Sequence, residues 1–114
     1  MEKFHISDIL TVMSGKMVSI RNMDGLYAIL NYMCNDNLFT HQIVRCMQEC
    51  RPYLEKQFPQ FRAINVDDLT DSNHFERMKA IEIQYGAYHE VEALPEGAHD
   101  YKDAVVELIE IHNK

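Results

Sequence analysis

Two amphipathic stretches separated by three small polar residues constrain the fold of this chain more than any other feature. In the first stretch, residues 24–34, large apolar side chains fall at i, i+3, i+4 and i+7, at Leu26, Ile29, Leu30 and Met33. That spacing places them along one face of a helix. Asn35-Asp36-Asn37 then ends the run, because Asn and Asp form tight turns and tolerate positive φ. The chain is therefore predicted to contain a helix, a sharp turn and a second helix.

Small polar residues mark where the first three helices begin. Ser7 is the predicted N-cap of a short helix that ends near Gly15. Asp24 and Thr40 are the predicted N-caps of the two helices of the pair. The side chains expected to point inward from the helix that starts at Thr40 are Ile43, Val44 and Met47.

Pro52 interrupts the run that follows Thr40. Proline has no backbone N–H, and its ring clashes with the preceding turn of a helix. The run is therefore expected either to kink at Pro52 or to restart as a fourth helix through Phe58, and a kink or restart near Arg51 is favoured. Residues 59–66 are expected to form a connector.

A further helix is predicted after this connector. Asp71 or Ser72 is its expected N-cap, and Gly86 stands where a glycine commonly ends a helix. Its predicted inward side chains are Phe75, Met78 and Ile81.

The C-terminal segment is predicted to form a strand and a last helix. Residues 88–93 alternate with period two, which indicates a short strand, and residues 95–97 turn the chain. Asp100 or Asp103 opens the last helix. Its predicted inner face carries Val105, Leu108, Ile109 and His112.

These elements predict an α+β fold that is mainly α. The chain has 114 residues and is expected to form one compact domain over 1–114, with four to five helices and a small β element. Its helical part covers about 6–58, and an acidic helix–strand–helix part covers about 67–112. No segment approaches the roughly 18 apolar residues of a membrane span, and the N-terminus lacks the pattern of a signal peptide. A soluble cytoplasmic protein without membrane contact is expected.

The net charge of −7 lies entirely in the second half of the chain. Binding along a nucleic-acid backbone needs clustered Lys and Arg, which the sequence does not supply. An acidic half instead suits solubility or a basic partner surface. Tyrosines lie among the acidic residues of this half. The acidic residues that form a candidate partner-binding face are Glu82, Glu90, Glu92, Glu96, Asp100 and Asp103. Carboxylates spaced in this way can imitate nucleic-acid phosphates and attract a basic channel.

Three cysteines, Cys34, Cys46 and Cys50, are expected to be free thiols in the core. Together with His41, the last two make H-x4-C-x3-C, which is not a recognised zinc spacing. No metal and no cofactor are predicted.

The start of the helix at Thr40 is a candidate anion site. Free N–H groups at a helix N-terminus carry the positive end of the helix dipole. The donors expected to hold a phosphate or carboxylate are Thr40, His41, Gln42 and Arg45, with Ser14 and Lys16 assisting. The competing interpretation is ordinary helix structure. In that case Arg45 pairs with Glu49 and His41 stacks on Phe39.

Signals for catalysis and for DNA binding are weak. No serine stands in a nucleophile motif such as G-x-S-x-G, and no H-E-x-x-H metal site occurs, so the protein is not expected to be an enzyme. A nucleophilic Cys–His pair, whose members need only be close in space, is kept as an alternative. Residues 24–34 and 40–50 resemble a helix–turn–helix in outline, but the acidic balance argues against it.

Several motifs resemble an uncharacterised domain family of tailed-phage and prophage genomes. They are Ile6-Ser7-Asp8-Ile9-Leu10, Ser14-Gly15, Met23-Asp24-Gly25 through Leu30-Asn31, NLFTHQ and Cys50-Arg51-Pro52. NLFTHQ, residues 37–42, is the most specific of them. The resemblance covers roughly residues 6–60 and is looser from Tyr85 to Leu108. The family has Thr-Thr-Gly where this chain has Met13-Ser14-Gly15, and Leu-Pro-Arg where it has Ile43-Val44-Arg45.

The resemblance implies a small phage accessory protein and carries no catalytic or binding residue with it. We expect a non-enzymatic inhibitor, for example of anti-CRISPR type, that binds a host defence protein in the host cytoplasm through its acidic face. A nucleic-acid-binding effector would be a suitable partner. The alternative is a sponge that binds a nucleotide at Thr40–Arg45, for which a homodimer with paired sites would be suited. A DNA-binding regulator is a third interpretation.

Overall fold

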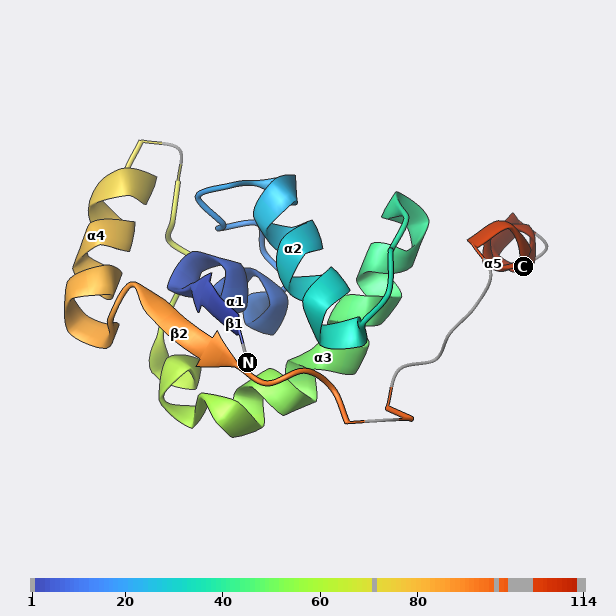
Figure 1. Ribbon diagram of the computed structural model, residues 1–114. Helices are drawn as coiled ribbons and strands as arrows, with labels where there is room; N and C mark the ends of the chain where they lie inside the picture. The colour runs from blue at the N-terminus through green and yellow to red at the C-terminus, as the bar shows by residue number, and fades with distance from the viewer. Residues whose placement is uncertain (1, 71, 96, 99–103, 113–114) are drawn as a thin grey trace.

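The computed structural model describes residues 2–70, 72–95, 97–98 and 104–112. Within them the fold is α+β and mainly α, as predicted, and a two-stranded sheet accompanies the helices (Figure 1). In chain order the elements are β1 (Glu2–His5), α1 (Ile6–Ser14), α2 (Met23–Cys34), the 3-10 helix η1 (Thr40–Gln42), α3 (Ile43–Gln57), the 3-10 helix η2 (Pro59–Ala63), α4 (His74–Tyr85), β2 (Tyr88–Val91) and α5 (Ala104–His112).

Helix α1 lies at the centre of the molecule. All of its residues from Ile6 to Met13 are buried, and it packs against both α2 and α3. The predicted stripe of α2 forms one wall of this core, because Ile29 and Leu30 are completely buried. Gly15 ends α1 in the left-handed conformation with φ 75°, as predicted. Burial of α1 on every side makes it the element that holds the other two helices together.

The two strands join the N-terminus to the second half of the chain. β1 and β2 are antiparallel, with Lys3 opposite Glu90 and Phe4 opposite His89. The alternation over residues 88–93 correctly predicted a strand, which the structure has over Tyr88–Val91. β1 was not predicted, since its four residues are too few to show a period.

The predicted N-caps of α1, α2 and α4 are wrong. The imidazole of His5, not Ser7, caps α1 by accepting the N–H of Ser7, and Ser7 itself is buried. Asn22, not Asp24, precedes α2. Asn73, not Ser72, precedes α4, while Asp71 lies outside the described residues. Each observed cap lies one or two residues from the predicted one, which is the range over which assigned helix ends vary.

Helix α3 runs unbroken from Ile43 to Gln57 with Pro52 inside it, so the predicted restart near Arg51 does not occur. Its buried face agrees with the prediction at Ile43, and Met47 packs partly buried against the core, but it differs at Val44. Val44 is 66% exposed, and the buried side chains are Ile43, Cys46, Cys50 and Leu54. The two thiols act as small apolar residues on this face. Val44 lies outside it.

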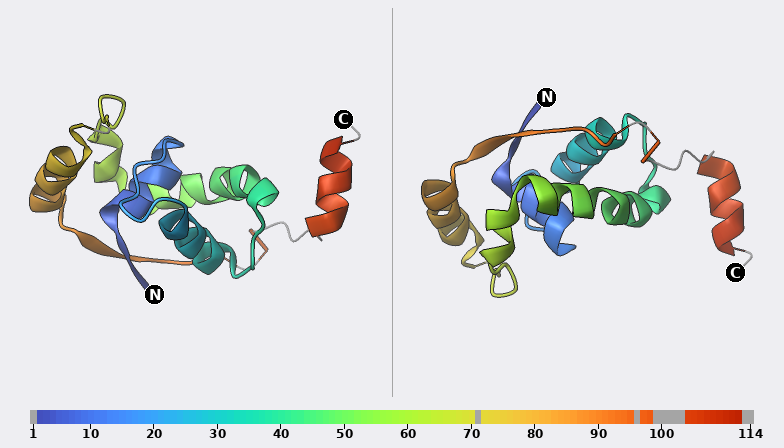
Figure 2. Two further views of the ribbon diagram at one scale, coloured as in Figure 1. Left: turned by 90° about the horizontal axis from the view of Figure 1, so that it is seen from above. Right: turned by 90° about the horizontal axis from the view of Figure 1, so that it is seen from below.

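The elements beyond η2 pack unevenly. In α4, Met78 and Ile81 are buried as predicted, whereas Phe75 is 73% exposed. Gly86 ends α4 as predicted. Helix α5 stands apart from the three-helix core (Figures 1 and 2), and its predicted inner side chains Val105, Leu108 and Ile109 are exposed. Among the described residues, no helix has both the length and the apolar character needed to cross a bilayer.

Candidate functional site

A hollow of about 670 Å³ lies between the C-terminal half of α3 and the end of β2. We call it the α3–β2 groove. Its lining combines aromatic, cationic and acidic side chains, among them Tyr53, Lys56, Phe58, Glu90 and Glu92. Tyrosine is enriched at surfaces that bind other proteins, and the rims of such surfaces are polar.

Gln57 fixes one side of the α3–β2 groove. Its side-chain oxygen accepts the backbone N–H of Glu92 at 2.8 Å, and its side-chain nitrogen donates to the Glu92 carbonyl at 3.2 Å. These are the two hydrogen bonds that a neighbouring strand would make. The segment after β2 is therefore tied to the end of α3.

Glu90 and Glu92 are the part of the predicted acidic face that the structure places on this groove. Both are exposed, and Val91 between them is fully buried, as the alternation of a strand requires. Lys3 stands opposite Glu90 in the sheet. Glu90 and Glu92 thus present two carboxylates on a backbone that is anchored from both sides.

The rest of the predicted acidic face is arranged differently. Glu82 is only partly exposed, and its carboxylate accepts a hydrogen bond from His5 at 2.6 Å. Glu96, Asp100 and Asp103 lie outside the described residues. The described part of the predicted acidic face is therefore centred on Glu90 and Glu92, at the end of β2.

The predicted anion site at Thr40–Arg45 has local hydrogen-bond partners. Thr40 is not the N-cap of α3: it begins η1, and its hydroxyl lies 2.6 Å from the hydroxyl of Tyr27. Gln42 is buried, and its side-chain oxygen accepts the N–H of Phe39 at 3.0 Å. The prediction that Thr40 caps α3 is wrong. Thr40 is the first residue of η1, which Phe39 precedes, and the residue that precedes α3 is Gln42.

His41 and Arg45 make the contacts expected of ordinary helix structure. His41 stacks on Phe39 with ring centres 6.3 Å apart. Arg45 forms an ion pair with Glu49 at 3.2 Å, one turn further along α3. Both contacts are the ones predicted if this segment is ordinary helix structure instead of an anion site.

Ser14 and Lys16 support a loop on the other side of α1. The Ser14 hydroxyl accepts the N–H of Lys16 at 3.1 Å. The Lys16 ammonium donates to three backbone carbonyls, those of Val66, Asp67 and Leu69. An ammonium that satisfies three carbonyls has its donors committed to holding this loop.

Three side chains stand in the order acid, imidazole and hydroxyl. Nε2 of His5 bonds to Glu82 at 2.6 Å, and Nδ1 of His5 bonds to the Ser7 hydroxyl at 2.7 Å. The order is that of a hydrolytic triad. Ser7, however, has no exposed surface, and its hydroxyl also accepts the N–H of Ile20 at 3.1 Å. A substrate cannot reach this hydroxyl, so the series connects α1 to α4 and to the loop before α2.

One cluster was missed by the sequence reasoning. Cys34 comes from the end of α2, and it meets Cys46 and Glu49 of α3. The spacing of Cys46, Glu49 and Cys50 indicates a shared helix face, but only the antiparallel return of the chain brings Cys34 to it. No linear zinc motif marks such a site.

Residues 4–64 match the family model described as Domain of unknown function (DUF7736). The chain belongs to this family. The DUF7736 region covers more than half of the chain and includes α1, α2, η1, α3 and η2, as well as the three cysteines. The α3–β2 groove has one wall inside the DUF7736 region and one wall, β2, beyond it. No curated protein and no solved structure matches the chain.

Proposed function

We propose that this protein is a non-enzymatic phage accessory protein that inhibits a host defence protein, for example a CRISPR effector, by binding it stoichiometrically. The contact is the α3–β2 groove, and the partner contributes a basic segment. The observation that carries the proposal is the placement of Glu90 on β2 and of Glu92 directly after it. Both carboxylates are exposed on an anchored backbone beside Tyr53.

Charge supports this proposal. The whole net charge of −7 comes from residues 58–114, and this half supplies the β2 wall of the groove. A negative surface attracts a basic partner over a distance and orients it during encounter. A defence protein with a nucleic-acid channel presents the Lys and Arg that would complement the two carboxylates.

The two alternatives have less support. A nucleotide sponge would use the side chains at Thr40–Arg45, which the structure engages in local hydrogen bonds, an ion pair and a ring stack. A DNA-binding regulator would need a basic surface around α3, against a net charge of −7.

Charge reversal in a phage-plating assay tests the proposal. The wild-type protein, expressed in hosts that each carry one defence system, should restore plating against at least one of them. Glu90→Lys combined with Glu92→Lys should abolish that rescue while circular dichroism and thermal unfolding stay unchanged. Glu76→Lys is the matched control, because Glu76 is exposed on α4 away from the groove. Rescue by the double variant equal to wild type would place the contact elsewhere.

A further inference from the structure

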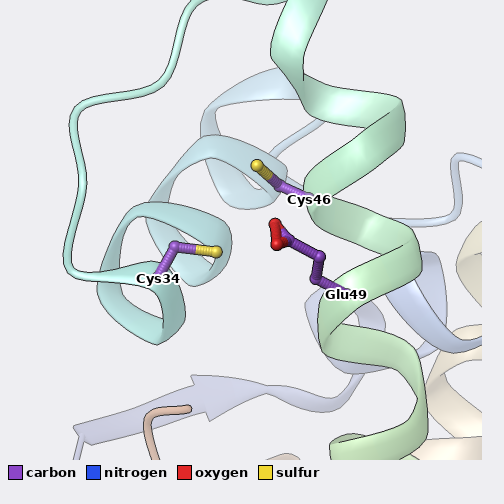
Figure 3. Close-up of side chains that lie close together, drawn as sticks. All are labelled: Cys34, Cys46 and Glu49. Carbon is purple, nitrogen blue, oxygen red and sulfur yellow. The ribbon is translucent and has the colours of Figure 1, made fainter. Parts of the chain in front are cut away.

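Cysteine thiols and a carboxylate converge between α2 and α3. The ligand atoms of Cys34, Cys46 and Glu49 all lie within 4.8 Å of one another. Figure 3 shows the two sulfur atoms and the carboxylate directed into the same space, Cys34 from the end of α2 and the others from α3. Cys34 and Cys46 are buried, and Glu49 stands at the edge of the cluster with 16% of its side chain exposed.

Cys50 adds a further sulfur to this cluster. Its sulfur lies 3.6 Å from that of Cys34. Two thiolates on one tetrahedral zinc, each at about 2.3 Å from the metal, stand about 3.8 Å apart, so this pair already has nearly the required separation. Cys46 and Cys50 are four residues apart on α3, the spacing at which two helical side chains can hold one metal ion.

The chemistry of the donors selects the metal. Thiolates favour zinc and other soft or borderline ions over magnesium and calcium, and a carboxylate is also a zinc ligand. Buried charge has to be balanced. Three thiolates and one carboxylate leave a divalent ion with two excess negative charges. The guanidinium of Arg45, 3.2 Å from Glu49, offsets one of them, and the side chain of Glu49 reaches solvent.

We propose that Cys34, Cys46 and Glu49 bind a zinc ion, with Cys50 completing a tetrahedral set. The ion joins the end of α2 to the middle of α3 and fixes the turn between them. A closed set of four protein ligands is the arrangement of structural zinc sites. The role is therefore stabilisation of the helix pair, and it is independent of the partner proposed for the α3–β2 groove.

Three of the four donors, Cys34, Cys46 and Glu49, need only small movements to reach bonding distance. Ligand atoms within 4.8 Å of one another must approach by roughly 1 Å to reach the spacing of a zinc tetrahedron. Side-chain rotation at Glu49 accomplishes part of this, since that side chain reaches the surface. Its ion pair with Arg45 then orients the ligating carboxylate, as second partners of metal ligands commonly do.

Metal titration of the full chain tests the proposal. Protein stripped with a chelator and kept reduced is titrated with Co²⁺, and then with Zn²⁺ in competition. We expect one equivalent of Co²⁺ to give the near-ultraviolet thiolate charge-transfer band and the intense visible bands of tetrahedral cobalt, which Zn²⁺ then abolishes. Zinc at about 100 times its dissociation constant should raise Tm by about 10 °C or more.

Two variants locate the site, and one controls for loss of an ion pair. Glu49→Gln and Cys46→Ser should each weaken Co²⁺ and Zn²⁺ binding at least tenfold. Glu55→Gln removes the equivalent i, i+4 ion pair with Arg51 further along α3, so it should bind both metals like wild type. If Cys46→Ser does not fold, Glu49→Gln still decides the question, because that side chain lies at the edge of the cluster.

Two results would overturn the proposal. The first is the absence of a thiolate charge-transfer band and of any rise in Tm with Zn²⁺ in the wild-type protein. The second is an affinity for Co²⁺ and Zn²⁺ that is unchanged in both single variants, Glu49→Gln and Glu55→Gln. That result would place the bound metal outside this cluster.

Discussion

Gly25 of α2 lies directly against the buried carboxylate of Asp8 in α1. A Cβ atom at position 25 would stand 2.3 Å from Oδ1 of Asp8 and 2.3 Å from the hydroxyl of Ser19. Asp8 has no exposed surface, and it accepts hydrogen bonds from Ser19 at 2.5 Å and from Arg21 at 2.8 Å. The close approach of α1 and α2 thus depends on a glycine at the point where a charged group is buried.

Replacing Gly25 should destabilise the protein even though Ala favours helices. In Gly25→Ala the new methyl group displaces Asp8 or Ser19, and overpacking of this kind costs about 1–3 kcal/mol. Chemical unfolding in urea measures the loss. Gly15→Ala is the comparison: nothing lies within 4 Å of a Cβ there, and only its positive φ of 75° is unfavourable. An unchanged or raised stability in Gly25→Ala would contradict the close contact.

The hydrogen bond between His5 and Glu82 should contribute measurably to stability. It joins β1 to α4 across 77 residues of chain, and the imidazole is buried. Glu82→Ala leaves the Nε2 proton of His5 without its acceptor, at a cost of about 1–3 kcal/mol. Thermal or urea unfolding measures it. Glu76→Ala, an exposed position on the same helix, should stay within about 0.5 kcal/mol of wild type, and equal effects of the two variants would argue against the bond.

Helix α5 should add little to the stability of the monomer. Ile109 is 54% exposed, whereas Ile81 of α4 is 6% exposed. Ile81→Ala is expected to cost about 2–5 kcal/mol, and Ile109→Ala less than about 0.5 kcal/mol. Unfolding at two protein concentrations measures both. A large, concentration-dependent loss in Ile109→Ala would show instead that α5 packs against a second copy of the chain.

Alkaline pH should destabilise the zinc-free protein through its buried thiols. The hydrogen bond to Cys34, together with burial, raises the pKa of Cys46 above its ordinary value of 9.0. At Cys34 the hydrogen bond from Cys46 lowers the pKa, but the bond to Cys50 and burial outweigh it, so that pKa is raised as well. Above about pH 9 the unfolded chain loses these two protons and the native protein keeps them.

The free energy of unfolding should therefore fall as pH rises above about 9, by up to about 1.4 kcal/mol per pH unit for each thiol. Below that pH both states hold the protons, so the two thiols contribute no slope. Urea unfolding with a reductant and a chelator, between about pH 8 and pH 11, measures the effect. Cys46→Ala removes one of the two thiols and should show a shallower decline than wild type. An equal decline in both proteins would show that other groups cause it.

Several features that depend on near neighbours in the chain were predicted correctly. The stripe from Leu26 to Met33, the turn at Asn35 and the ends of α1 and α4 at Gly15 and Gly86 follow from local periodicity and turn chemistry. Asn35 does adopt the left-handed conformation, with φ 49°. Errors were concentrated where a side chain had a choice of partner, as at Thr40, whose hydroxyl meets Tyr27 instead of capping α3.

The sequence by itself determined which segments are helical and where the chain turns, because these preferences act over three or four residues. Tertiary structure alone decided which distant groups meet. Cys34 reaches Cys46 and Glu49 only because α2 and α3 return on each other, and Glu90 and Glu92 form a groove with Tyr53 only because Gln57 holds the end of β2. Such contacts depend on the packing of whole helices, and no spacing along the chain encodes them.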